Sequence, residues 1–201
     1  MRRYFFALSF VIFSSARFAS ADDVLAKANS ELDTTMPLTI YLASPLGFAK
    51  STESFMKNEL IPSIKGTGVT VINPWDADSE VNRKIEEAKS INDLNKRRAA
   101  WREIIQLLGR ANAKSIEQSD GVVAVLDGVD VDSGTAAEIG YATAVGKWVI
   151  GYRGDFRRTG EDVASEVNLQ VEYFIYKSGG SVVHNLPDLV RELRGKIKTR
   201  K

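Results

Sequence analysis

The chain has 201 residues, of which 44% are hydrophobic and 26% charged, with a formal net charge of +1 and no cysteine. This composition is typical of one globular α/β domain, and the near-neutral charge gives no electrostatic reason to bind nucleic acid polymers. The absence of cysteine excludes a disulfide framework, a thiolate metal site, a cysteine nucleophile and a lipoprotein anchor. The single histidine, His184, excludes histidine-rich metal sites, and because it lies late in the chain we expect it to be a surface or packing residue and expect no histidine-based triad.

The first 21 residues have the features of a secretory signal peptide. Arginines at positions 2 and 3 precede an apolar run over residues 4–13, and Ala19-Ser20-Ala21 forms a small-residue cleavage site. The apolar run is too short to span a membrane, and an uncleaved amphipathic anchor is the alternative interpretation. We expect cleavage after Ala21, a periplasmic or secreted mature protein, and no membrane attachment after cleavage.

Residues 22–36 are predicted to be a poorly ordered lead-in, and residues 37–201 a single domain. Within that domain, short runs rich in apolar and β-branched residues predict five strands. These runs cover residues 38–42, 69–72, 121–126, 147–152 and 181–183. Helices are predicted over about 48–64 and 93–117, from Ser133 onward, and over 168–177 and 186–197. A charged stretch, 79–90, leads into the second helix, and 153–167 is expected to be a polar loop.

Strands that alternate with helices predict a parallel sheet with right-handed crossovers. We therefore expect a doubly wound α/β fold, flavodoxin-like or Rossmann-like, with a five-stranded parallel sheet in three αβα layers. The long helix over 93–117 has an apolar side formed by Trp101, Ile104, Ile105, Leu107 and Leu108. Neither a P-loop nor a GxGxxG fingerprint follows the first strand, so the usual phosphate cradle for a nucleoside triphosphate or dinucleotide is missing.

The segment 132–140 is the strongest candidate for a functional site, because it follows a buried strand and opens a helix. Ligands of open α/β sheets bind beyond the carboxyl ends of the strands. Glu138 shares a helix face with small and apolar residues, and no Lys or Arg occurs between Lys114 and Lys147. An unpaired carboxylate on such a face is costly unless a site uses it, so Glu138 is our candidate nucleophile. A structural ion pair with a distant arginine is the alternative.

Asp132 lies six residues before Glu138, in the loop that precedes the helix. Paired carboxylates at a bound sugar perform glycosyl transfer: one attacks or stabilises the cationic anomeric carbon, and the other manages the proton on the leaving group. The alternative role for Asp132 is a plain helix cap. The ends of the first two strands, residues 41–44 and 73–76, are expected at the same edge of the sheet.

At these residues the chain resembles the nucleoside 2-deoxyribosyltransferase family, over about residues 37–180. The resemblance is carried by pieces in the family's order: Ile40-Tyr41-Leu42-Ala43-Ser44-Pro45, Asn112, Ser119-Asp120-Gly121, the run from Asp132 to Ala142, Gly146-Lys147 and Asn168-Leu169-Gln170. It implies that Glu138 attacks the anomeric carbon of a 2′-deoxynucleoside and releases the base. The deoxyribosyl group would then stay on Glu138 until a second base accepts it.

The resemblance also implies roles for other residues. Tyr41 would orient Glu138, Asp132 would bind the deoxyribose or assist proton transfer, and Asn168 of a neighbouring subunit would bind the sugar 5′-hydroxyl. The expected partners are therefore small-molecule nucleosides, free nucleobases and further copies of the chain, in a homo-oligomer with shared active sites. No metal or organic cofactor is expected. Substrate contacts are expected from Ser44, Asp76, Asn112, Gly134, Asn168 and Gln170.

Two positions depart from the family pattern. Asn112 stands where some relatives have an aspartate and is unable to act as an acid, and Gln170 replaces an apolar residue. Two other functions are alternatives to the transferase. One is an N-glycoside hydrolase of nucleosides or nucleoside monophosphates. The other is a non-catalytic nucleoside-binding protein, against which the intact Asp132 and Glu138 argue.

Overall fold

The computed structural model describes residues 37–76 and 79–199, within a compact unit that spans Pro37–Lys201. The predicted signal peptide and lead-in lie outside the described residues. Five parallel strands form one sheet in the order β2-β1-β3-β4-β5, which confirms the predicted fold class. The strands are β1 (Thr39–Ala43), β2 (Thr70–Ile72), β3 (Gly121–Val125), β4 (Trp148–Tyr152) and β5 (Val182–Val183).

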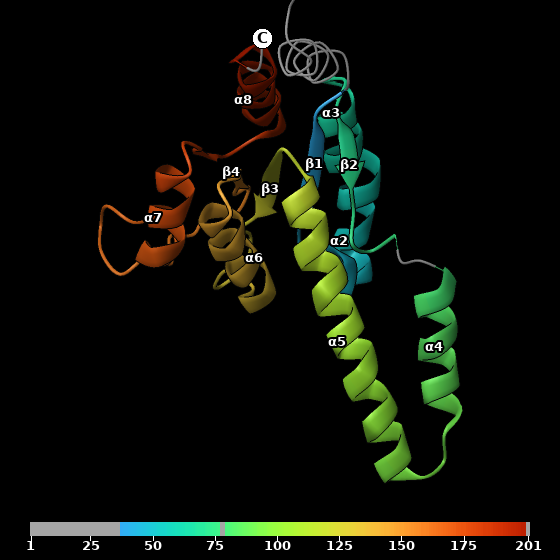
Figure 1. Ribbon diagram of the computed structural model, residues 1–201. Coiled ribbons are helices and arrows are strands. Elements are labelled where there is room, and N and C mark those ends of the chain that lie inside the picture. The colour runs from blue at the N-terminus through green and yellow to red at the C-terminus, as the bar shows by residue number, and fades with distance from the viewer. Residues whose placement is uncertain (1–36, 77–78, 200–201) are drawn as a thin grey trace, which may run out of the picture. The chain divides into compact units, whose positions relative to one another are not determined.

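Helices cover both faces of the sheet (Figure 1). One face is covered by α5 (Leu94–Gln118), α6 (Ser133–Ala144) and α7 (Leu169–Lys177). The other is covered by η1 (Leu46–Phe48), α2 (Lys50–Phe55), the π-helical η2 (Met56–Leu60), α3 (Ile61–Lys65) and α8 (Leu186–Thr199). None of the described helices is long and apolar enough to cross a membrane.

The sheet separates two apolar clusters, because side chains alternate between its faces along each strand. Leu42 and Ile150 point into the cluster beneath α3 and α8, while Val122 and Val149 point into the cluster beneath α6 and α7. All five residues of β3 are buried, as expected for the central strand of a parallel sheet. Both faces of the sheet are therefore covered by apolar side chains.

The helix predicted over 48–64 is interrupted. Ala49 adopts an extended backbone, with φ −125° and ψ 134°, which separates the turn η1 from α2. The chain then passes through the π-helical η2 before α3 ends near Gly66. The break leaves Phe48 outside the apolar cluster that Met56 and Leu60 enter.

The charged stretch 79–90 is helical, which the sequence analysis did not predict. It forms α4 (Ser79–Ser90), which packs antiparallel beside α5 (Figure 1). Its charges pair along its own surface, as in Arg83–Glu87 and Lys84–Glu80, and such pairs stabilise a helix that has few apolar residues. The prediction for α5 was also wrong at one position, because Ile105 is 59% exposed rather than part of the buried side. Ile104 is the residue buried there.

A buried arginine joins the loops that follow β3 and β4. The guanidinium of Arg153, which is 2% exposed, donates hydrogen bonds to the carbonyl oxygens of Leu126 (2.5 Å) and Arg157 (2.6 Å). The backbone N–H of Asp155 donates to Asp127 Oδ1 at 2.9 Å, which adds a second link. Buried polar groups left without such partners destabilise a fold, so these bonds fix the loop that leads into α6.

Candidate active site

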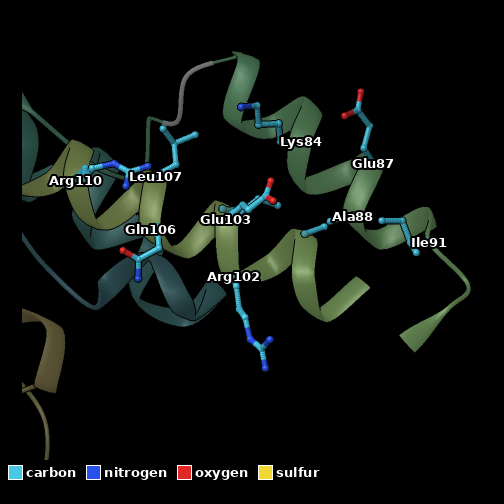
Figure 2. Close-up of a pocket in the computed structure, with 11 residues that line it drawn as sticks. Lys84, Glu87, Ala88, Ile91, Arg102, Glu103, Gln106, Leu107 and Arg110 are labelled. Atoms are coloured by element: carbon cyan, nitrogen blue, oxygen red, sulfur yellow. The ribbon is translucent and has the colours of Figure 1, made fainter. Parts of the chain in front are cut away.

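Among the cavities that the described residues form, two are lined in part by residues of α5. The larger, about 690 Å³, lies between α4 and α5 and is lined mainly by long charged and aliphatic side chains (Figure 2). None of the predicted site residues lines it. The smaller, about 320 Å³, is lined by residues from four segments: Ser44, Phe48, Pro74, Trp75, Leu108, Asn112, Asp132, Gly134, Thr135 and Glu138. We place the candidate site in the smaller cavity, because the predicted carboxylates converge there.

Glu138 is held at the wall of this cavity by two neutral donors. The hydroxyl of Tyr41, at the centre of β1, donates to Glu138 Oε1 at 2.6 Å, and Asn112 Nδ2 on α5 donates to the same oxygen at 3.3 Å. Within the described residues, Glu138 forms no salt bridge and its Oε2 accepts no hydrogen bond. One carboxylate oxygen is therefore anchored and the other is free to react.

The surroundings of Glu138 oppose its ionisation. Burial raises the pKa of Glu138, and the charge of Asp132 raises it further, whereas the hydrogen bonds from Tyr41 and Asn112 lower it. The raised pKa is the net result, since burial is the largest of these effects. Burial and the bond to Glu138 also raise the pKa of Tyr41, so Tyr41 remains a neutral donor.

Asp132 caps α6 and faces the cavity at the same time. Its Oδ2 accepts hydrogen bonds from the backbone N–H of Thr135 at 3.0 Å and from Thr135 Oγ1 at 3.4 Å. The cap that we considered as an alternative for Asp132 is therefore present, and it uses only one carboxylate oxygen. A cap at this position also directs the first turn of α6, which brings Gly134 and Glu138 to the same cavity.

Two aromatic residues that were not predicted from the sequence, Phe48 and Trp75, form an aromatic wall of the same cavity. Trp75 Nε1 donates to the carbonyl oxygen of Ser44 at 2.9 Å, and Phe48 packs edge-on against Trp75 with ring centroids 4.5 Å apart. A Cβ at Gly47 would lie 2.3 Å from the Trp75 ring, so only glycine permits this approach. Phe48 is 76% exposed, which leaves an aromatic surface uncovered at the cavity.

Part of this wall could have been found from the sequence. Asn73-Pro74-Trp75 follows the second predicted strand, at the edge where ligands bind, and an aromatic residue there is a reasonable candidate for stacking. Phe48 and Leu108 gave no such signal, because each looks like a core position of an amphipathic helix.

Three predicted substrate-binding residues do not line the cavity. Asp76 lies in the turn after β2, where its Oδ1 accepts a hydrogen bond from Asn73 Nδ2 at 3.1 Å. Asn168 caps α7, accepting from the backbone N–H of Gln170 at 3.0 Å and donating to Glu161. Within the single chain, Asn168 and Gln170 are therefore separate from the cavity that contains Glu138.

His184 lies apart from the candidate site. His184 is exposed, with Nδ1 3.3 Å from the carbonyl oxygen of Arg153 and Nε2 3.5 Å from Glu166. In the part of the chain that the structure describes, no group of three His, Asp or Glu residues is arranged to hold a metal ion.

The arrangement suits a reaction that develops positive charge next to a carboxylate. Glu138 and Asp132 line the cavity together with the aromatic rings of Phe48 and Trp75, and among the described residues no Lys or Arg lines it. Negative charge without nearby cations stabilises an electron-poor carbon, and aromatic faces bind flat heterocycles. The cavity therefore combines groups suited to a reacting sugar carbon with groups suited to a planar base.

Comparisons with known proteins identify a family for the chain and support its fold. The profile of the nucleoside 2-deoxyribosyltransferase family matches residues 40–174. A conserved protein from Enterococcus faecalis V583 has 24% identity and a TM-score of 0.58, over 80% of this chain and 99% of that one. A 2-deoxyribosyltransferase from Bacillus psychrosaccharolyticus has 19% identity and a TM-score of 0.54, over 79% and 95%. These two structures support the fold. No curated protein sequence matches the chain.

We predict that Tyr41→Phe raises the pKa of Glu138, because it removes the 2.6 Å bond that stabilises the anion. Asn112→Ala should raise the pKa less, since it removes the longer and weaker bond. A ¹³C NMR titration of the glutamate carboxyl carbons measures both changes. Tyr141→Phe is the matched control, because the Tyr141 hydroxyl donates to Glu117 instead. An unchanged or lower pKa of Glu138 in Tyr41→Phe would contradict the prediction.

Proposed function

Because the chain belongs to the nucleoside 2-deoxyribosyltransferase family, we propose that it moves 2-deoxyribose between nucleobases through a covalent intermediate on Glu138. The observation that carries this proposal is the Glu138 carboxylate itself. One of its oxygens is anchored by Tyr41 and Asn112, and the other faces a cavity without cations. A carboxylate held in this way is a positioned nucleophile.

The first half of the reaction breaks the N-glycosidic bond. Glu138 Oε2 attacks the anomeric carbon, the carbon–nitrogen bond breaks, and the base leaves with the bonding electrons and takes up a proton. The transition state resembles an oxocarbenium ion, which the carboxylates stabilise. A 2-deoxy sugar lacks the electron-withdrawing 2′-hydroxyl, so its cation forms readily and few catalytic groups are required.

The second half returns the enzyme to its starting state. A nitrogen of the incoming base attacks the anomeric carbon, the ester bond to Glu138 breaks, and the carboxylate is regenerated. Two displacements at the same carbon retain its configuration. Trp75 and Phe48 support this exchange, since their rings offer a stacking surface for the leaving and the incoming base.

We propose that Asp132 handles the proton on the base. Its Oδ2 is engaged by Thr135, and its charge already acts on Glu138, so it lies close to the reacting carbon. Asn112 is an amide and can only donate or accept hydrogen bonds, which leaves Asp132 as the second carboxylate of the cavity. Ser44 and Gly134 line the same cavity and are our candidates for contacts to the sugar.

The decisive experiment incubates the purified mature chain with thymidine, with and without adenine. We expect thymine and deoxyadenosine when adenine is present, and little turnover when it is absent. Rapid release of free deoxyribose without adenine would instead identify a hydrolase. Glu138→Gln should lower turnover by at least about three orders of magnitude, since it removes the nucleophile. Mass spectrometry should detect a deoxyribosyl adduct on Glu138 in the parent chain only.

The matched control for Glu138→Gln is Glu117→Gln, which removes an exposed carboxylate of α5 and should leave turnover unchanged. Loss of activity in Glu138→Gln should not reflect unfolding. The pKa of Glu138 is raised in the folded state, so the ionised side chain reduces stability as the pH rises through that pKa. At neutral pH, Glu138→Gln should therefore be at least as stable as the parent. An adduct on another residue would overturn the role of Glu138.

Asp132→Asn tests the proton-transfer role separately from the helix cap. Asparagine caps helices about as well as aspartate, so the stability should change little, while turnover should fall roughly 100-fold or more. Asp93→Ala is the control for capping alone, because Asp93 caps α5 through the backbone N–H of Lys96. That variant should lose about 1 kcal/mol of stability and keep its turnover. If Asp132→Asn kept full turnover, Asp132 would have no catalytic role and would serve only to cap α6.

We further propose that Asn168 completes the site of a neighbouring subunit, in a homo-oligomer. Asn168 is exposed at the start of α7 and does not reach the cavity of its own chain. Asn168→Ala and Glu138→Ala should each be nearly inactive, and mixing them should restore activity, because some sites then combine intact residues from both chains. Size-exclusion chromatography confirms that mixed oligomers have formed. If they form without activity, Asn168 does not act across subunits.

A further inference from the structure

One carboxylate, that of Glu161, holds the side chain of Asn168. Glu161 lies in the loop between β4 and α7, and its Oε1 accepts a hydrogen bond from Asn168 Nδ2 at 2.7 Å. Its Oε2 accepts from the backbone N–H of Leu169 at 2.8 Å. Asn168 Oδ1 in turn accepts from the backbone N–H of Gln170 at 3.0 Å. A carboxylate can only accept and a backbone N–H can only donate, so these partners give the Asn168 amide a single orientation.

The Asn168 side chain keeps one hydrogen for a ligand. An amide nitrogen carries two hydrogens, and Glu161 takes one of them. Within the described residues, no second acceptor is bonded to Asn168 Nδ2, and Asn168 is exposed at the start of α7. Asn168 therefore meets a ligand as a hydrogen-bond donor, and a carboxylate lies directly beside that donor.

The loop that carries Glu161 is closed on itself. The backbone N–H of Thr159 donates to the carbonyl oxygen of Glu166 at 2.9 Å, which joins the two ends of residues 159–166. Inside this loop, Asp162 Oδ1 accepts from the backbone N–H of Ser165 at 3.1 Å. These bonds restrict the positions that the loop can take, so Glu161 is held against the start of α7.

The cations of this region are directed elsewhere. Arg153 and Arg158 donate to carbonyl oxygens, and Arg157 forms a salt bridge with a neighbouring aspartate. Lys177 lies at the opposite end of α7 from Asn168. Residues 153–177 contain these four cations and five anions, which are Asp155, Glu161, Asp162, Glu166 and Glu172. Within the described residues, Glu161 is the only one of these charged side chains that is bonded to the Asn168 side chain.

We propose that Glu161 determines specificity at the 5′ end of the sugar, where it selects a nucleoside with a free 5′-hydroxyl over a nucleoside 5′-monophosphate. The inference rests on the proposed function, in which Asn168 meets the sugar 5′ oxygen. An oxygen that accepts the second N–H of Asn168 would lie about 5 Å from Glu161 Oε1, given ordinary hydrogen-bond lengths around a planar nitrogen. A neutral hydroxyl is compatible with this carboxylate, whereas a phosphate with roughly two negative charges is repelled by it.

Hydrogen bonding by Asn168 alone would give the opposite preference. Charged phosphate oxygens accept hydrogen bonds more strongly than a hydroxyl does, so the charge of Glu161 is what disfavours the monophosphate. Asp132 and Glu138 act in the same sense, because both line the cavity and among the described residues no Lys or Arg lines it. Those two carboxylates are required for the proposed reaction. Glu161 is therefore the charge that can be removed to test selectivity.

The experiment compares kcat/KM for thymidine and for thymidine 5′-monophosphate, with adenine as the acceptor. Glu161→Gln removes the charge and keeps the size, so the preference for thymidine should fall roughly 10-fold, as expected for an exposed carboxylate acting on a doubly charged group. The change should appear mainly in KM, because the 5′ end takes no part in bond breaking. Glu161→Asp keeps the charge and should keep the preference, even if both substrates bind more weakly.

Salt provides a second readout that a purely structural role of Glu161 would not change. Raising the ionic strength screens charges, so it should weaken the preference of the parent much more than that of Glu161→Gln. Glu172→Gln is the matched control, because the Glu172 carboxylate lies at the same helix start but accepts from the backbone N–H of Val167 at 3.0 Å. This variant should keep the parent's preference. Circular dichroism checks that each variant is folded.

Three results would each overturn the role of Glu161: a parent that prefers the monophosphate, an unchanged preference in Glu161→Gln, or an equal fall in Glu172→Gln. Calorimetry on Glu138→Ala, with and without Glu161→Gln, measures the Kd of both ligands without turnover. Selective binding that depends on Glu161, in a parent that turns over neither ligand, would refute the proposed reaction and support the role of Glu161. Turnover of thymidine with no dependence on Glu161 would do the reverse. A chain that binds neither ligand would refute both.

Discussion

The hydrogen bond between Tyr41 and Glu138 is the interaction on which the site depends. It joins the centre of a buried strand to a helix whose start is set by a different loop, 97 residues later in the chain. Tyr41 is fully buried, so its hydroxyl has one position, and the carboxylate takes its orientation from it. Asn112 approaches the same oxygen from α5. One strand of the sheet and two helices on one of its faces therefore determine where one oxygen atom lies.

The folded protein stabilises the ionised carboxylate of Glu138 less than water does. Burial raises the pKa of Glu138 more than its two donors lower it, so the ionised carboxylate remains costly in the folded protein. The rest of the fold has to offset this cost. The fully buried strand β3, the cap of α6 by Asp132 and the carbonyl-bonded Arg153 all hold the segment between β3 and α6. A costly buried charge is tolerated at a site when the packing around it is this well determined.

The α5 helix has two environments along its length. Its second half packs on the sheet, where Ile116 is buried and Asn112 reaches the site. Its first half packs against α4, and Ile104 of α5 and Ala88 of α4 are buried where the two helices meet. The helix therefore links the cavity of Glu138 to the helix pair that α4 and α5 form.

The sequence by itself determined the order of strands and helices, the parallel sheet and the edge at which Asp132 and Glu138 meet. These follow from local patterns, since strand and helix periods, capping residues and the carboxyl-end rule need no long-range contact. Only the tertiary structure showed that the aromatic rings of Phe48 and Trp75 line the same cavity as these carboxylates. Phe48 became part of the site because Ala49 breaks a predicted helix. Arg153 became a buried link because it binds the distant carbonyl oxygens of Leu126 and Gly128 as well as the nearby one of Arg157. Residues 79–90 have few apolar residues, and the structure shows that they form a helix with ion pairs along its own surface and with Ala88 buried where it packs on α5.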